Sequence, residues 1–159
     1  MGNQQNFVLR VYGVAIHENK VLVVDEYWFE TYMTKFSGGG MEFGEGTIDC
    51  LMRECMEELG QEVEVLKHLY TTDYFQPTIF IPNKQLVSIY YLIRLSDPDK
   101  LKTTQIRNDF EPKEGNMAFR WIELDKLTPE EFSFPVDRKV AKILISNLHT
   151  GQNQQRSST

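Results

Sequence analysis

Three glutamates in one short segment are the side chains of this chain best suited to chemistry. Glu57 and Glu58 follow Glu54 by three and four residues, among apolar residues that recur at helical spacing. At about 100° per residue, a helix would bring the three carboxylates together on the side away from its apolar stripe. Like charges at this spacing repel, and they lie at the negative end of the helix dipole, so a bound cation would stabilise them. Carboxylate oxygens without Cys or His ligands favour a hard ion such as Mg²⁺ or Mn²⁺.

The apolar residues around these glutamates predict a helix of about three turns. Thr47 is the expected N-cap, and Gly60 is the expected left-handed residue that ends the helix. The predicted buried stripe consists of Ile48, Leu51, Met52, Cys55 and Leu59. A purely structural interpretation is also open, because Arg53 and Glu57 have the spacing of an ordinary ion pair on a solvated helix face.

A glycine-rich loop leads into this helix without a break. Residues 38–61 read GGGMEFGEGTIDCLMRECMEELGQ, with Gly39, then Glu45 after five residues and Arg53 after seven more. This order and spacing resemble the Nudix box. The specific part of the resemblance is this segment, while the order of the predicted elements around it supports the family over most of the chain.

Two positions depart from the family's pattern. Gln61 stands where an aliphatic residue is usual, and Ser37 precedes the glycines where proline is frequent. Neither position carries a metal-binding group in the family, so the departures concern the conformation of the loop. Every charged position of the box is present, which favours an enzyme over a Nudix-like module that binds a nucleotide without cutting it. A metal-buffering or purely structural domain would leave the glycine loop unexplained.

The resemblance implies a reaction and a role for each residue of the box. Nudix hydrolases cut the pyrophosphate of a nucleoside diphosphate linked to another group, by attack of water on phosphorus with a divalent metal ion. The implied metal ligands are the carbonyl of Gly39 and the carboxylates of Glu54, Glu57 and Glu58. Arg53 would hold the acidic side chains in register, and Glu45 would orient the loop and a metal-bound water. Mg²⁺ is the expected ion, with Mn²⁺ as the alternative.

The residue that accepts the proton of the attacking water varies within the family. It is either a glutamate of the box, with Glu57 and Glu58 as the choices here, or an acid on a later loop. Glu114 lies just before a predicted strand and is the candidate for the later position, with Glu111 as the second choice. Each of these two loop acids could equally be an ordinary solvated side chain.

Residues outside the box would choose the substrate. Pro77 lies sixteen residues beyond Gln61, close to where ADP-ribose-hydrolysing members carry a proline, so an ADP-ribose-type nucleotide sugar is favoured. The alternative is a (d)NTP pyrophosphohydrolase, and turn formation alone could explain the proline. Trp28 is the candidate for stacking on a nucleobase, although packing would explain it as well. The neighbours Tyr74 and Phe75 complete the substrate candidates.

The composition limits the remaining classes of function. The net charge is −6 and no basic stripe is present, so we expect a small nucleotide as partner and no polymeric nucleic acid. No apolar run approaches the ~18–20 residues of a membrane span and no leader opens the chain, which predicts a cytoplasmic protein away from membranes. The resemblance allows a homodimer, since dimers are common in the family. Cys50 and Cys55 share one helix and are not expected to pair.

The chain of 159 residues suits one domain. We expect a flexible N-terminus at 1–6, a single domain over 7–149 and a disordered polar tail at 150–159. The apolar patterns predict strands at 7–16, 20–27, 86–95 and 117–122, and a strand or a bent pair of strands at 62–74. Loops are expected at 27–35 and 96–116, a turn and short helix at 123–127 and a last helix from 134. This order predicts an α/β fold with a mixed sheet and helices on both faces, which matches the αβα sandwich implied by the Nudix resemblance.

Overall fold

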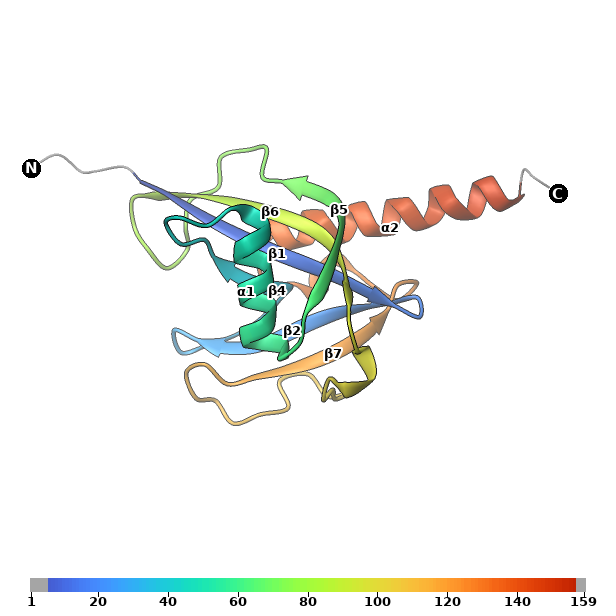
Figure 1. Cartoon of the computed structure of the whole chain (residues 1–159), viewed down its shortest axis with the longest axis horizontal. Coiled ribbons are helices and arrows are strands. Elements are labelled where there is room, and N and C mark those ends of the chain that lie inside the picture. Colours follow the sequence, from blue (N-terminus) through green and yellow to red (C-terminus); the bar gives the residue numbers. More distant parts are fainter. Residues whose placement is uncertain (1–5, 157–159) are drawn as a thin grey trace, which may run out of the picture. The chain divides into compact units, whose positions relative to one another are not determined.

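The computed structural model describes residues 6–156, so the predictions for residues 1–5 and 157–159 lie outside the described residues. The described chain contains seven strands, two α-helices and two short 3₁₀ helices (Figure 1). Their bounds are β1 Asn6–His17, β2 Lys20–Trp28, β3 Thr31–Lys35, β4 Ser37–Gly40, α1 Thr47–Leu59, β5 Val63–Thr71, β6 Lys84–Leu95, η1 Pro98–Lys100, β7 Met117–Glu123, η2 Pro129–Glu131 and α2 Pro135–Arg156. Among the described residues, no helix is long and apolar enough to cross a membrane.

Contacts between residues group the chain into two compact units. The first unit consists of the residues up to Ile16 together with Phe36–Lys102. The second consists of His17–Lys35 and the residues from Thr103 onward. The glycine loop and its helix belong entirely to the first unit, so the geometry of the predicted metal ligands is internal to that unit.

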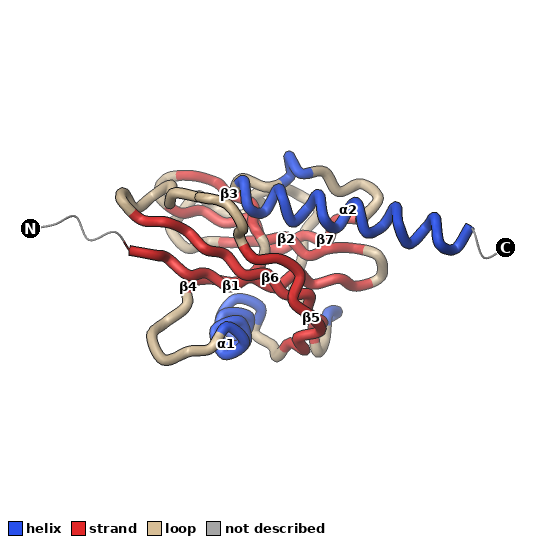
Figure 2. The backbone as a smooth tube through the Cα atoms, turned by 90° about the horizontal axis from the view of Figure 1, so that it is seen from above, coloured by secondary structure: helices blue, strands red, loops and turns tan. Residues whose placement is uncertain are grey.

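The first unit contains a mixed sheet, which confirms the predicted fold class. Strand β1 pairs in parallel with β6, from Asn6 opposite Lys84 to Ala15 opposite Ile93. Strand β4 pairs antiparallel with β1, and β5 pairs antiparallel with β6. Helix α1 contacts β4, beside which it lies in Figure 2. The strands are rich in β-branched and aromatic residues, which suit a pleated, half-buried surface.

Glycine 13 lets helix α1 approach the sheet. A Cβ at Gly13 would lie 2.5 Å from Ile93 Cδ1 and 3.2 Å from Leu51 Cδ1, so a larger residue would displace the Ile93 side chain and crowd Leu51 of the helix. The buried residues of α1 are Cys50, Leu51, Cys55 and Leu59. The predicted stripe was wrong at Ile48, which is 43% exposed in the first turn, while Cys50 is fully buried in its place.

The ends of α1 follow the prediction at the C-terminus only. Gly60 has φ 68° and ends the helix, as expected. The N-cap is Gly46 rather than Thr47, and its N–H donates to the Asp49 carboxylate at 3.0 Å. The Thr47 hydroxyl instead hydrogen-bonds Tyr91 Oη at 2.7 Å, so it ties the helix start to β6.

The second unit contains strands β2, β3 and β7. The sequence analysis predicted a loop at 27–35, where the structure has the β2–β3 hairpin. Strand β2 pairs antiparallel with both β3 and β7. The β2–β3 hairpin turns at Phe29 and Glu30, which both have positive φ (51° and 55°). The loop prediction was wrong because such turns usually contain Asn or Gly, whereas the aromatic residues here extend the two strands.

The C-terminal part of the second unit also differs from the prediction. Residues 124–126 form the predicted turn, but the short helix lies later, at η2, because Pro129 at its first turn favours helical φ. Val140 and Leu144 of α2 are buried, as their spacing predicts. Helix α2 continues to Arg156, past the start of the predicted disordered tail at Thr150. No proline interrupts this polar segment, and extending an existing helix avoids the cost of starting a new one.

A buried ion pair holds the second unit together. The Arg120 guanidinium donates to both carboxylate oxygens of Asp25, at 2.6 and 2.8 Å, and Asp25 is fully buried. Thr34 Oγ1 and the Asn108 N–H donate to the same carboxylate. Arg120 also contacts Glu131 at 2.5 Å, which links β7 to η2. Burial raises the pKa of Asp25, but the hydrogen bonds from Arg120, Thr34 and Asn108 outweigh it, so the pKa is below its ordinary value.

Replacing Asp25 by Asn leaves Arg120 buried opposite an amide. We expect the free energy of unfolding near neutral pH to fall by about 3–5 kcal/mol. The carboxylate stabilises the wild type above the ordinary aspartate pKa of 3.8, and this contribution is lost as the pH falls through the lowered folded-state pKa. Urea unfolding of both proteins from neutral to acidic pH measures the difference, with the exposed Asp99→Asn as control. If the difference in the free energy of unfolding between the wild type and Asp25→Asn did not become smaller at acidic pH, the stabilising role of the Asp25 carboxylate would be contradicted.

Candidate functional site

The Glu54 carboxylate lies directly against the backbone of Gly39. A Cβ at Gly39 would lie 2.4 to 2.5 Å from the three carboxyl atoms of Glu54, which is closer than real Cβ contacts come. The Glu54 side chain is only 15% exposed. Glycine is therefore the residue that lets α1 bring this carboxylate onto β4.

The Glu58 carboxylate, one helical turn later, is held by the start of the same strand. Its Oε2 accepts hydrogen bonds from Ser37 Oγ at 2.7 Å and from the Gly38 N–H at 3.2 Å. The serine that departs from the family's usual proline thus supplies a hydroxyl donor to the box. The sequence offered a signal for this role, since a hydroxyl one residue before the glycines can reach a helix packed on them.

Arg53 joins the loop and the helix through its whole guanidinium. Its Nε and Nη2 donate to the two carboxylate oxygens of Glu45 at 2.5 and 3.0 Å. Nη2 also donates to the Gly40 carbonyl at 3.0 Å, and Nη1 donates to Glu54 Oε1 at 2.9 Å. A planar fork with five N–H groups makes such a fixed arrangement feasible. Arg53 therefore sets the position of Glu45 and Glu54 relative to β4.

The electrostatics of the two acids differ. The hydrogen bonds from Arg53 and, next, from the Glu42 N–H lower the pKa of Glu45 to about 2, so Glu45 stays ionised. Burial raises the pKa of Glu54, and the nearby charges of Glu58 and Glu57 act in the same direction against Arg53. Ionised Glu54 therefore lacks part of the solvation it would have in water. A cation beside it would compensate for that loss.

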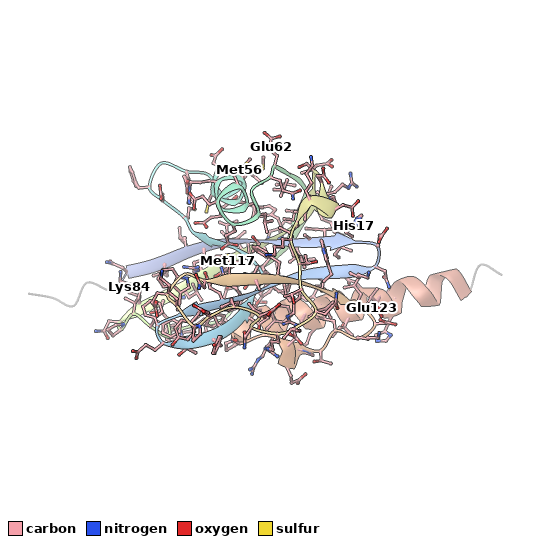
Figure 3. All side chains as sticks on the ribbon, turned by 90° about the horizontal axis from the view of Figure 1, so that it is seen from below. His17, Met56, Glu62, Lys84, Met117 and Glu123 are labelled. Carbon is pink, nitrogen blue, oxygen red and sulfur yellow. The ribbon has the colours of Figure 1, made fainter. Side chains whose placement is uncertain are left out.

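The three glutamates are not gathered as the sequence analysis predicted. Glu54 and Glu58 face β4 at the border of the buried side of α1, whereas the Glu57 side chain is 60% exposed and its Oε1 lies 3.5 Å from Arg53 Nη1. Around the helix axis, Glu57 lies about 100° from Glu58 and about 60° from Glu54, so it is on the solvent side of the other two carboxylates. Met56 on the outer side of α1 is also exposed (Figure 3). Within residues 6–156, no three Cys, His, Asp or Glu side chains lie close enough to hold a metal ion by themselves.

The donor set nevertheless suits a hard divalent cation. The carboxylates of Glu54 and Glu58 lie against the glycines of β4. These glycines have no side chains that would shield their carbonyl groups. All of these donors are oxygens, which Mg²⁺ prefers. Backbone carbonyls can complete a site for which the side chains alone are too few. The residues present therefore fit the metal that the sequence pattern implies.

Cys50 lies beneath the loop. Its Sγ is 3.6 Å from the Gly40 carbonyl oxygen and 3.8 Å from Arg53 Nη2. Burial, followed by the charge of Glu45, raises the pKa of the thiol to about 11. Cys50 thus supports the loop as a neutral, buried group, a position that the predicted stripe of the helix had missed.

The NUDIX domain family model matches residues 7–142. The chain belongs to the NUDIX family. The residues described above form its Nudix box, and the protein is a Nudix-type hydrolase. No curated protein sequence matches the chain.

Solved structures show the same Nudix fold at low sequence identity. The solution structure of the Escherichia coli ORF135 protein is 16% identical, with a TM-score of 0.65 over 92% of this chain and 94% of that protein. A Nudix hydrolase from Nitrosomonas europaea is 20% identical, with a TM-score of 0.66 over 92% of this chain and 74% of that one. An ADP-ribose pyrophosphatase from Streptococcus suis is 18% identical, with a TM-score of 0.56 over 88% and 90%.

Outside the Nudix box, Trp28 has a fixed ring and an exposed surface. Its indole N–H donates to Glu26 Oε1 at 2.7 Å, and the other oxygen of this buried glutamate lies 3.4 Å from Lys35 Nζ. Gly115 lies beside the ring, since a Cβ there would be 3.5 Å from Trp28 Cζ2. The residue is 40% exposed. A ring held at its edge and open on its surface can stack on a planar group.

The other predicted substrate residues belong to the first unit. Tyr74 and Phe75 are 38% and 70% exposed. Pro77 forms an isolated bridge with Gln85 at the start of β6. Strand β5 ends at Thr71, so these residues follow it as an irregular segment, which agrees with the predicted break in the strand pattern although the strand itself ends earlier than Tyr74.

Glu114, the predicted loop acid, contacts the turn of the β2–β3 hairpin. Its two carboxylate oxygens accept hydrogen bonds from the N–H groups of Phe29 and Glu30 at 3.1 and 3.0 Å. Both residues have the left-handed conformation, which costs a non-glycine residue about 1–2 kcal/mol. Glu114 therefore stabilises a strained turn, whether or not it also accepts a proton.

A matched pair of glycine variants tests the geometry of the Nudix box. A Cβ at Gly39 overlaps Glu54, whereas a Cβ at Gly40 meets only Arg10 Nη1, at 4.0 Å. We expect Gly39→Ala to weaken Mn²⁺ binding about 10–100-fold, because it displaces a ligand, and Gly40→Ala to bind Mn²⁺ like the wild type. Titration of free Mn²⁺ by electron paramagnetic resonance measures both. Equal affinities in the two variants would show that the contact with Glu54 is not needed for metal binding.

A second pair of changes tests Glu114. We expect Glu114→Ala to speed hydrogen exchange of the β2–β3 amides, because the turn loses both acceptors, and Glu30→Gly in the same chain to restore slow exchange by removing left-handed strain. Glu111→Ala, on the same loop, is the control. Unchanged exchange in Glu114→Ala would contradict the structural role. Turnover that is lost in Glu114→Ala and not restored by Glu30→Gly would assign Glu114 as the base.

Proposed function

We propose that the protein hydrolyses the pyrophosphate bond of a nucleoside diphosphate linked to another group, by attack of water on phosphorus, with Mg²⁺ as the metal ion and Mn²⁺ as its substitute. The observation that supports this most directly is the contact of the Glu54 carboxylate with the backbone of Gly39, in a box whose charged positions are all occupied. The substrate we propose is a small nucleotide.

The proposed metal ligands are the Gly39 carbonyl, Glu54 and Glu58, with Glu57 as a further ligand or base. When bound, the ion would withdraw charge from the phosphates and make a coordinated water easier to deprotonate. Arg53 holds Glu54 in place and keeps Glu45 ionised beside the loop. Glu57 is the proposed base within the box, because its side chain is 60% exposed and therefore open to water, and its contact with Arg53 Nη1 is long, at 3.5 Å. Glu114 remains the alternative base.

The proposed substrate is an ADP-ribose-type nucleotide sugar. Pro77 supports it by its distance from the box, and a structure of similar fold is an ADP-ribose pyrophosphatase. We propose that Trp28 stacks on the base, since its ring is fixed and exposed, and that Tyr74, Phe75 and Pro77 contact the substrate as well.

Purified protein with Mg²⁺ is assayed on ADP-ribose, NADH, dinucleoside polyphosphates and the (d)NTPs, and each product is identified. We expect AMP from ADP-ribose. Glu58→Gln should lower kcat about ten-fold or more while the fold is kept, because Gln can still accept from Ser37. Glu64→Gln is the control, since that side chain is 63% exposed and pairs with Arg94 away from the box. Pyrophosphate released from a triphosphate would favour the (d)NTP alternative, and normal turnover in Glu58→Gln would remove its assignment.

A further inference from the structure

Arg10 lies on the opposite side of the glycine strand from Glu54. In the β1–β4 register, Arg10 is opposite Gly40 and Val11 is opposite Gly39. Side chains of neighbouring residues in a strand point to opposite faces. A Cβ at Gly39 would therefore point at Glu54, and a Cβ at Gly40 would point toward Arg10. The distances agree with this register, because a Cβ at Gly40 would lie 4.0 Å from Arg10 Nη1. A carboxylate and a guanidinium therefore flank a strand that carries no side chains at these two positions.

The Arg10 side chain is held in a defined orientation by a tyrosine. Its Nε donates to Tyr12 Oη at 2.6 Å, and its Cζ lies 5.6 Å from the centroid of the Tyr12 ring. Tyr12 stacks on Tyr90 at 5.2 Å, and the two rings are 7% and 1% exposed. Tyr12, which holds Arg10, is therefore itself packed in the core. The tyrosine hydroxyl and ring thus fix the direction of the guanidinium.

A planar guanidinium beside bare backbone suits a phosphate group. Arginine binds phosphate oxygens through two parallel N–H groups, and such charge-assisted hydrogen bonds are among the strongest in proteins. We propose that Arg10 binds a phosphate oxygen of the substrate's diphosphate, from the side of β4 opposite to Glu54. This inference rests on the proposed function and adds a residue to it: the box carboxylates hold the metal, and Arg10 contributes affinity for the diphosphate itself.

Binding of the uncleavable α,β-methylene-ADP, measured by calorimetry with saturating Mn²⁺, separates the contribution of Arg10 to nucleotide binding from that of the metal ligands. We expect Arg10→Ala to weaken nucleotide binding roughly ten-fold or more, since a hydrogen bond to a charged group is lost. Binding of Mn²⁺ alone should stay unchanged. Arg10→Lys should restore part of the affinity, because it keeps the charge and loses the fork. Tyr12→Phe, which removes the acceptor for Nε, should give an intermediate loss.

Arg94→Ala is the matched control, because Arg94 is 63% exposed and pairs with Glu64 on the same sheet. Nucleotide affinity in Arg10→Ala equal to that of the wild type would overturn the proposal while leaving the proposed function intact. Loss of Mn²⁺ affinity in Arg10→Ala would also overturn it, by showing that Arg10 supports the metal site. A wild type that binds Mn²⁺ but no nucleotide would reject the proposed function.

Discussion

The contact between the Glu54 carboxylate and the Gly39 backbone is the constraint on which the rest of the site depends. No atom can be added at residue 39 without displacing that carboxylate. Helix α1 must therefore pack closely on β4, and Gly13 makes this possible on the neighbouring strand by leaving room for Leu51 and Ile93. Two glycines far apart in the sequence thus serve one purpose, the approach of a helix to a sheet.

Charge balance is the second organising factor. The box brings four carboxylates near one guanidinium, and Arg53 reaches three of them as well as the Gly40 carbonyl. Glu58 receives its hydrogen bonds from Ser37 and Gly38 instead. The negative charge left over explains why these side chains suit a cation. In the second unit, by contrast, the charge of buried Asp25 is neutralised by Arg120, so no metal ion is needed there.

The sequence predicted the elements that follow regular patterns and missed those decided by tertiary contacts. The strands around Val11, Leu22 and Tyr90, the helix of the box and its end at Gly60 follow from periodicity and a left-handed glycine. The β2–β3 hairpin was missed because Phe29 and Glu30 form its turn without glycine, and the acceptor that makes this possible, Glu114, is more than eighty residues away.

For the site, sequence reasoning named the box residues but misjudged their directions. It grouped Glu57 with Glu54 and Glu58, although only the latter two lie against β4 and Glu57 is 60% exposed. The position of Arg10 beside Gly40 depends on the β1–β4 register, which spacing along the chain does not specify.

The burial of Cys50 has a consequence for the redox behaviour of the protein. Oxidants and alkylating reagents attack the thiolate, and a thiol with a pKa of about 11 contains very little of it at neutral pH. Cys55, one turn further along α1, is buried as well and has a pKa of about 12, raised mainly by burial. The two thiols of the box are therefore protected by the same close packing that positions Glu54. Thiol-modifying reagents should accordingly react only slowly with the two cysteines of this helix.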